Sequence, residues 1–245
     1  MNPSPNPVPF TSAHGRARIV KILLIVGAFV TGMSLVVETL SLVFPPLTEE
    51  QELGDNPMGA AIMLITFLIA LLEVIIYVST VVFFCVWLYR AADNLRAFNP
   101  WSRPDYSAGW AVGSFFVPFV NLLVPYRAVK EVWQKSWPSD SALLSAPNPP
   151  AWFPLWWLFW LLSNFANNIS LRLTFEESVP QGTATIVSMF AGALSILAAV
   201  FAYLVVDAID KRQEETSGRT QLPQFPTPPP PPSYPPLSDV VTPTP

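Results

Sequence analysis

Five polar side chains lie inside long apolar runs, where ionisable and amide groups are uncommon. Glu38 and Glu73 are carboxylates, and Asn164, Asn167 and Asn168 recur at spacings that put them on one face of a helix. A charged carboxylate at the centre of a bilayer costs about 2.5–3.5 kcal/mol, so these groups should face neighbouring helices or stay protonated. They form either a polar pocket or proton path around Glu73, or interhelical hydrogen bonds, and the pattern favours the bonds.

Other kinds of reactive chemistry have little support in the sequence. His14 is the only histidine and Cys85 the only cysteine, whereas a zinc or haem site needs several such ligands. No nucleophile–base pair or glycine-rich phosphate loop accompanies them. We therefore expect no enzymatic activity, no cofactor and no metal. The net charge of −4 argues against nucleic-acid binding, which needs a clustered basic surface.

The polar groups must be positioned by unusually apolar segments. Only 12% of the 245 residues are charged and 51% are hydrophobic, while an ordinary soluble domain carries about 25% charged residues. Four runs are long enough to cross a bilayer, which takes about 20 apolar residues. We therefore predict an all-α integral membrane protein with four transmembrane helices in a domain of residues 19–210. The predicted spans are residues 19–44, 59–89, 152–171 and 184–206.

A fifth apolar stretch, residues 109–124, is too short to be a fifth span. As a straight helix it would rise about 24 Å, less than the hydrocarbon core of about 30 Å. Pro118 would also interrupt its hydrogen-bond ladder. We predict that residues 109–137 form a re-entrant or interfacial segment on the cytoplasmic side.

The second half of that segment should be an amphipathic helix that begins near Pro125. Val129, Val132 and Trp133 share one face of it. This face lies either on the membrane surface or against other cytoplasmic parts of the same protein. Six tryptophans fall near the same boundary, where indole rings commonly anchor a protein. They are Trp87, Trp101, Trp110, Trp133, Trp137 and Trp152.

Basic residues orient the spans, because cytoplasmic loops retain lysine and arginine. Four spans with a cytoplasmic N-terminus put 12 of the 13 basic residues inside and leave only Arg172 outside. A fifth span would divide them seven to six. We therefore expect a multi-pass protein with both termini in the cytoplasm.

Residues 1–18 and 217–245 are predicted to be disordered tails, the second of them proline-rich. The second tail includes a proline run from 228 to 232 followed by Ser233 and Tyr234. It is either a plain tail or the docking segment for a cytoplasmic protein partner. In the last predicted span, small residues at 191, 195 and 199 permit close helix packing, within the bundle or in a homo-oligomer.

The segment from Trp87 to Trp133 carries residues in a distinctive order and spacing. They are Trp87, Arg90, Asn94, Arg96, Trp110, Pro118, Asn121, Pro125, Tyr126, Glu131 and Trp133. With these positions the segment resembles the bacterial membrane family called domain of unknown function 4328. The resemblance extends over residues 59–206, although Ala108 stands where the family pattern has a proline. It implies a multi-pass protein of the bacterial inner (plasma) membrane and supplies no catalytic residue. It also points to this segment as the functional part.

Two functions remain open from the sequence. The favoured one is a membrane-embedded interaction or scaffold module that acts through its cytoplasmic loop and tails. The alternative is a small oligomeric transporter or channel that uses the polar intramembrane cluster around Glu73. In both cases the lipid bilayer is the first partner.

Overall fold

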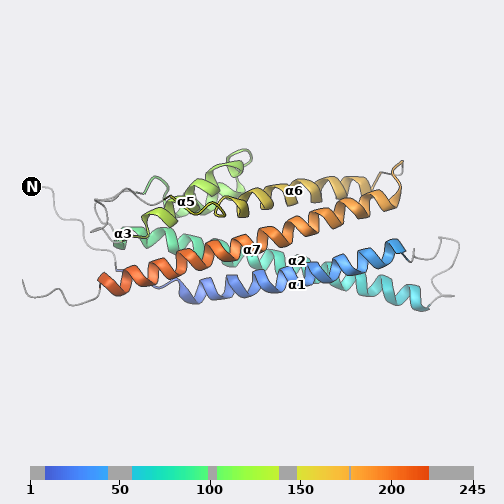
Figure 1. The fold of residues 1–245 in the computed structure, drawn as a ribbon, viewed down its shortest axis with the longest axis horizontal. Helices are drawn as coiled ribbons and strands as arrows, with labels where there is room; N and C mark the ends of the chain where they lie inside the picture. Colours follow the sequence, from blue (N-terminus) through green and yellow to red (C-terminus); the bar gives the residue numbers. More distant parts are fainter. Residues whose placement is uncertain (1–8, 44–56, 99–103, 138–147, 177, 221–245) are drawn as a thin grey trace, which may run out of the picture.

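The computed structural model describes residues 9–43, 57–98, 104–137, 148–176 and 178–220, and every regular element among them is helical. The all-α prediction is therefore confirmed for this part of the chain. Four long helices run along the molecule (Figure 1). They are α1 (His14–Val43), α2 (Pro57–Asp93), α6 (Leu155–Thr174) and α7 (Gln181–Thr220).

Three of the long helices are apolar and long enough to cross a membrane. The qualifying segments are His14–Leu40, Leu64–Phe98 and Gly182–Gly218, which contain most of the first, second and fourth predicted spans. Many of their large apolar side chains face outward, for example Phe29 and Phe67, as expected of helices in contact with lipid.

The third predicted span, residues 152–171, corresponds to α6. This helix has 20 residues and a length of about 30 Å, which equals the hydrocarbon thickness. Its asparagines lower its mean hydropathy, and it is not among the three qualifying helices.

The long helices alternate in direction and pack in the spatial order α2, α1, α7, α6. The start of α1, the end of α2, the start of α6 and the end of α7 therefore lie at one end of the molecule. The same end carries five short elements, here together called the cap. They are α3 (Leu95–Phe98), α4 (Ala108–Gly113), η1 (Ser114–Phe116), η2 (Val120–Leu122) and α5 (Val124–Lys135).

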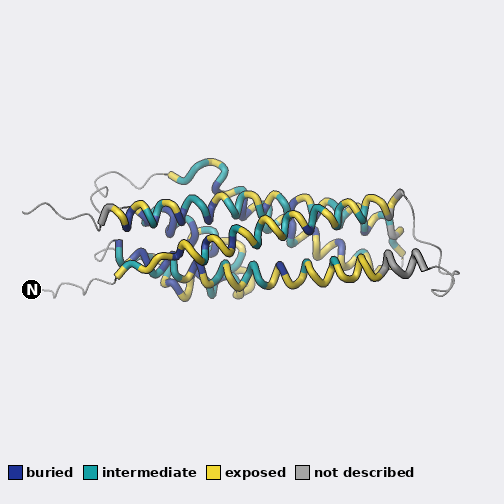
Figure 2. The backbone as a smooth tube through the Cα atoms, turned by 90° about the horizontal axis from the view of Figure 1, so that it is seen from below, coloured by how far each residue is buried: buried dark blue, intermediate teal, exposed yellow. Residues whose placement is uncertain are grey.

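The main hydrophobic core lies at this capped end (Figure 2). Trp87, Trp133 and Phe153 are buried there with residues of α7 such as Ile209. Burying a large apolar side chain stabilises a fold by about 1.5–3 kcal/mol. Two of the tryptophans expected to anchor the protein at the membrane boundary, Trp87 and Trp133, are thus core residues. Among the described residues of the opposite half, a small buried cluster forms around Ala166, Ala191 and Leu194.

The stretch predicted not to span is broken into short turns, as its length and Pro118 suggested. The chain leaves η1, turns at Phe119 and enters η2. Phe119 has a φ of 63° and its side chain is 85% exposed, and a positive φ is uncommon for any residue other than glycine. Trp157 Nε1 donates a hydrogen bond to Leu122 O at 2.9 Å, so α6 satisfies one carbonyl that the break leaves free.

The sequence left open whether the apolar face of the helix after the break lies on the membrane or on the protein, and the structure shows which. α5 begins at Val124 with Pro125 in its first turn, close to the predicted start. Val129, Val132 and Trp133 are buried in the main core. The apolar face of α5 therefore packs on the protein itself.

The helices α1 and α7 extend into the two segments that the sequence assigned to tails. Residues 14–18 belong to α1 and residues 217–220 to α7. Ala17 is fully buried at the capped end, which explains why α1 starts so early. Residues 1–8 and 221–245 lie outside the described part of the chain. The prediction that they are disordered tails therefore stays a prediction.

Candidate functional site at the capped end

The two carboxylates inside the apolar helices each accept a hydrogen bond from a serine on a neighbouring helix. Ser34 Oγ of α1 donates to Glu73 Oε1 of α2 at 2.8 Å. Ser188 Oγ of α7 donates to Glu38 Oε1 of α1 at 2.8 Å. Both carboxylates are half-buried at helix–helix contacts that involve α1. This geometry supports the interpretation in which these groups hold the helices together.

The asparagines of α6 form hydrogen bonds within their own helix. Asn164 Nδ2 donates to Trp160 O at 2.7 Å, and Asn168 Nδ2 donates to Asn164 O at 2.8 Å. Asn167 and Asn168 are exposed. The structure thus places Glu38 and Glu73 at the contacts of α1, and the asparagines on α6, which packs on α7.

Glu131 fixes the segment that enters α4 onto α5. Its side chain is nearly buried, and its two carboxylate oxygens accept hydrogen bonds from the backbone N–H groups of Asp105 and Tyr106, at 2.6 and 3.1 Å. Lys135, one turn later on α5, pairs with the same carboxylate. A buried carboxylate needs this number of donors, because leaving its charge without partners is costly.

Asn94 joins three segments of the chain at the junction of α2 and α3. It is 2% exposed, and its Nδ2 donates to Thr11 O at 3.0 Å and to Gln213 Oε1 at 3.2 Å. Gln213 Nε2 in turn donates to Ala91 O at 2.8 Å and to Ser136 Oγ at 3.0 Å. These five residues form a polar network, buried except at Thr11, that links the N-terminal segment, α2, α7 and the end of α5.

The residues before α1 are held along this network. The ring of Phe10 packs on Phe98 with a centroid distance of 5.3 Å. Ser12 Oγ donates a hydrogen bond to Glu214 of α7, and Ala13 is buried. We call residues 10–13 the N-terminal arm. The sequence placed it in a tail, because its short length and polar composition gave no sign of a docking site.

Arg212 connects α7 to the end of α5. Its guanidinium carbon lies 3.6 Å from the ring centroid of Trp133 and 4.5 Å from that of Trp137. Its Nη1 also donates to Trp133 O at 3.0 Å. A cation held over two indole faces is favourable, with strength that depends on how far it is desolvated.

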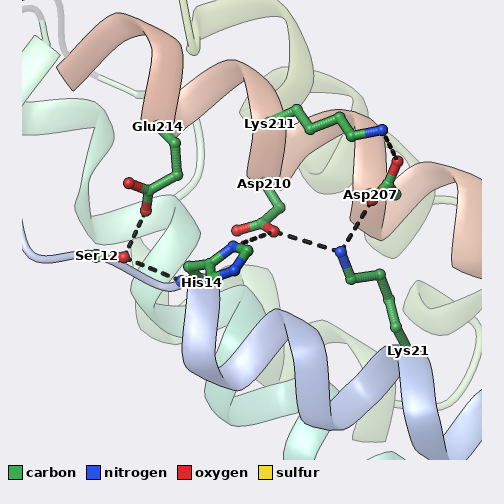
Figure 3. Close-up of polar contacts among 7 residues, drawn as sticks. All are labelled: Ser12, His14, Lys21, Asp207, Asp210, Lys211 and Glu214. Atoms are coloured by element: carbon green, nitrogen blue, oxygen red, sulfur yellow. Dashed lines mark hydrogen bonds and ion pairs between the residues drawn. The ribbon is translucent and has the colours of Figure 1, made fainter. Parts of the chain in front are cut away.

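A row of ion pairs joins α1 to the last turns of α7 (Figure 3). Lys21 Nζ lies 2.9 Å from Asp207 Oδ1 and 3.5 Å from Asp210 Oδ2. His14 Nδ1 lies 2.9 Å from the same Asp210 oxygen, and Lys211 pairs with Asp207 within α7. Among the described residues, no group of three or more His, Cys, Asp or Glu side chains could hold a metal ion.

Several of the positions in the Trp87–Trp133 pattern have structural roles. Trp87 and Trp133 are core residues, and Pro125 is buried in the first turn of α5. The ring of Tyr126 packs on Phe153 at 6.4 Å. Together with Asn94 and Glu131, these residues hold the cap onto the long helices.

The other positions of the pattern lie at the surface or are half-buried. Arg96, Trp110 and Pro118 are exposed, and Asn121 is half-buried in η2. Arg90 is half-buried and pairs with Asp93 one turn later at 3.4 Å. These are the positions that a ligand or partner can reach.

Sequence reasoning missed the contribution of α7 to this site. Asp207, Asp210 and Glu214 follow the last predicted span, and no role was predicted for them from the sequence. Their i, i+3 and i+7 spacing puts them on one face of a helix, and that regular spacing was the signal that could have indicated a packed polar face. Ser136 and Gln213 gave no comparable signal.

Residues 58–211 match the family model described as Domain of unknown function (DUF4328). The match covers more than half of the chain and contains the whole Trp87–Trp133 pattern. The chain belongs to the DUF4328 family. No curated protein and no solved structure matches it. The DUF4328 match begins after α1, so the N-terminal arm and its helix lie outside the matched residues.

Proposed function

We propose that this DUF4328 protein is a four-span protein of a bacterial inner membrane with both termini in the cytoplasm. We further propose that it acts as an interaction or scaffold module through its cap and tails, and that it is not an enzyme. The observation that carries the functional proposal is the distribution of buried polar bonds. Asn94 and Glu131 of the Trp87–Trp133 pattern use such bonds to hold the cap in place, whereas Glu38 and Glu73 accept hydrogen bonds from serines of neighbouring helices.

Two observations support the four-span topology. Every described lysine and arginine except Arg172 lies in the half of the molecule that carries the cap, which matches the retention of basic residues in the cytoplasm. α6 also follows the candidate span α7 along its length. Phe159 stacks on Phe201 at 5.6 Å near one end, and Ser170 Oγ donates to Ala184 O at 3.3 Å near the other.

The polar face of α5 supports the cap as the interaction surface. Its apolar face packs in the core and is unavailable to a partner, while Arg127 is exposed. A partner would therefore meet a surface whose backbone is fixed by Glu131 and by the core, so that little order is lost on binding.

Photo-crosslinking at the two ends of the molecule tests the interaction proposal. A photoreactive amino acid replaces Arg127 on the cap or, as a matched control, the exposed Arg172 at the other end of α6. We expect a defined protein adduct in intact cells from position 127 and none from position 172. Deleting residues 221–245 then shows whether the tail contributes to the same adduct. Equal adducts from both ends, or none from the cap, would contradict the proposal.

The topology has a separate test that uses membrane-impermeant thiol labelling. In a Cys85→Ser background, Arg172→Cys should be labelled from outside intact cells, and Lys130→Cys should be labelled only after lysis. Labelling of position 130 in intact cells would overturn the four-span orientation.

A further inference from the structure

A groove lies on the outer surface of the bundle at the capped end. It has a volume of about 310 Å³ and is lined by Arg16, Cys85, Val86, Tyr89, Arg90 and Val112. Arg16 lies in the first turn of α1, residues 85–90 lie in the last turns of α2, and Val112 lies in α4. The volume is at the lower end of the range of about 300–1,000 Å³ for ligand pockets.

The charges in this groove are only partly compensated by the protein. Arg16 forms no ion pair with any residue that the structure describes. Arg90 pairs with Asp93 at 3.4 Å, a contact between groups that both remain partly exposed. A guanidinium has five N–H donors, so Arg90 keeps donors for a second anion. The exposed lining of the groove is almost wholly apolar, so Arg16 and Arg90 line it mainly with carbon atoms. A phosphate group would therefore sit at the edge of the groove, where the flexible guanidinium groups can turn to it, and arginine binds phosphate well.

The remaining walls of the groove are apolar or amphipathic. Cys85, Val86 and Val112 provide an apolar base, and Tyr89 is 48% exposed beside them. Tyrosine favours the membrane interface because it joins an apolar ring to a polar hydroxyl group. A small hydrophilic anion would gain nothing from such walls, whereas an amphiphilic anion would bury apolar surface there.

An exposed valine stripe leads from the groove toward the membrane centre. Val78, Val82 and Val86 recur every four residues on α2 and are 53%, 53% and 46% exposed. Arg90 is the next position of the same stripe. A chain of methylene groups lying on these valines would thus end beside the guanidinium of Arg90.

From these observations we propose that the groove binds an anionic phospholipid, with its phosphate between Arg16 and Arg90 and one acyl chain along the valine stripe. Basic pockets between transmembrane helices are suited to anionic headgroups. The inference rests on the proposed membrane placement, but it requires no protein partner and no particular orientation.

The first experiment measures lipid binding to the full-length protein in neutral detergent by native mass spectrometry. Phosphatidylglycerol and phosphatidylcholine with the same acyl chains are titrated separately, and phosphatidylglycerol should bind more tightly. Arg16→Gln and Arg90→Gln should each weaken phosphatidylglycerol binding about fivefold, and the double variant about 25-fold, since a basic residue near an anionic surface contributes about 1 kcal/mol.

Arg18→Gln is the matched control, because Arg18 is exposed on the same helix and does not line the groove. It should leave binding unchanged. Thermal unfolding of every variant checks the fold, and if Arg90→Gln unfolds the protein, Arg16→Gln decides alone. Equal binding of the two lipids, or full phosphatidylglycerol binding by a folded Arg16→Gln variant, would overturn the proposal.

Two further measurements distinguish a bound phospholipid from a bound inorganic anion. Val86→Trp should fill the groove and weaken phosphatidylglycerol binding, whereas Ile75→Trp, at another exposed position of α2, should not. Inorganic phosphate at lipid-equivalent concentration should not displace the lipid, and displacement would identify a site for free anions. Carbonate extraction tests the membrane placement independently. Release of the protein by carbonate would contradict the proposed membrane placement, whatever the result of the lipid titrations.

Discussion

The capped end and the opposite half of this DUF4328 protein are stabilised in different ways. At the capped end, aromatic side chains, buried amides and a buried carboxylate from the N-terminal arm, α2, α5 and α7 share one core. In the opposite half, long helices with exposed apolar faces meet through small residues and Ser–Glu hydrogen bonds. The capped end is therefore organised like a soluble domain core, while the other half has the exposed apolar faces expected of helices in contact with lipid.

The largest difference between the two regions should come from removing an aromatic ring. Trp133→Ala deletes a buried core ring and the platform for Arg212, so we expect a loss of about 3–5 kcal/mol in the free energy of unfolding. Phe29→Ala removes a ring that is 66% exposed in the opposite half. It should change stability by less than about 1 kcal/mol. Denaturant titration in detergent measures both, and similar losses would contradict the comparison.

A smaller effect should follow from removing the carboxylate that fixes the cap. Glu131→Ala leaves the N–H groups of Asp105 and Tyr106 without their acceptor and removes the nearer of the two carboxylates that pair with Lys135. This should cost about 2–3 kcal/mol. Glu176→Ala, an exposed acidic residue at the far end, is the control and should be nearly neutral. Hydrogen exchange should show faster exchange at residues 105 and 106 in the first variant only. Unchanged exchange there would mean that Glu131 does not hold this segment.

The smallest effect should be the coupling between α1 and α2. Ser34→Ala and Glu73→Gln combined in a double-mutant cycle should reveal an interaction of about 0.6–2 kcal/mol, the usual range for hydrogen bonds between membrane helices. Proton or solute flux in proteoliposomes should be the same for Glu73→Gln and the original protein. Loss of flux in a folded variant would favour the transporter alternative over the scaffold.

The sequence predicted the helical elements well because they depend on local patterns. Run length located the long helices, and proline located both the break near Pro118 and the start of α5. The basic residues that the sequence grouped on one side lie, among the described residues, at the end where the long helices carry the cap. The count of spans depends on α6, whose asparagines make its hydropathy a poor guide.

The sequence could not predict which distant residues meet at the capped end. Thr11, Asn94 and Gln213 are separated by most of the chain, and no spacing rule relates them. The same holds for Gly192 on α7. A Cβ atom there would lie 2.9 Å from Leu35 Cδ2, so the absence of a side chain permits the close approach of α1 and α7. Such contacts depend on tertiary packing, which period and composition do not encode.

The N-terminal arm has a consequence for the order in which the molecule is completed. Phe10, Thr11 and Ser12 are synthesised before all four long helices, yet Gln213 and Glu214, which complete their site, belong to the last turns of α7. Because chains emerge from the N-terminus onward, the arm must wait until α7 has been made. The arm can therefore dock only after residue 214 has been synthesised. In a chain that ends earlier, the arm would stay undocked and accessible to proteases.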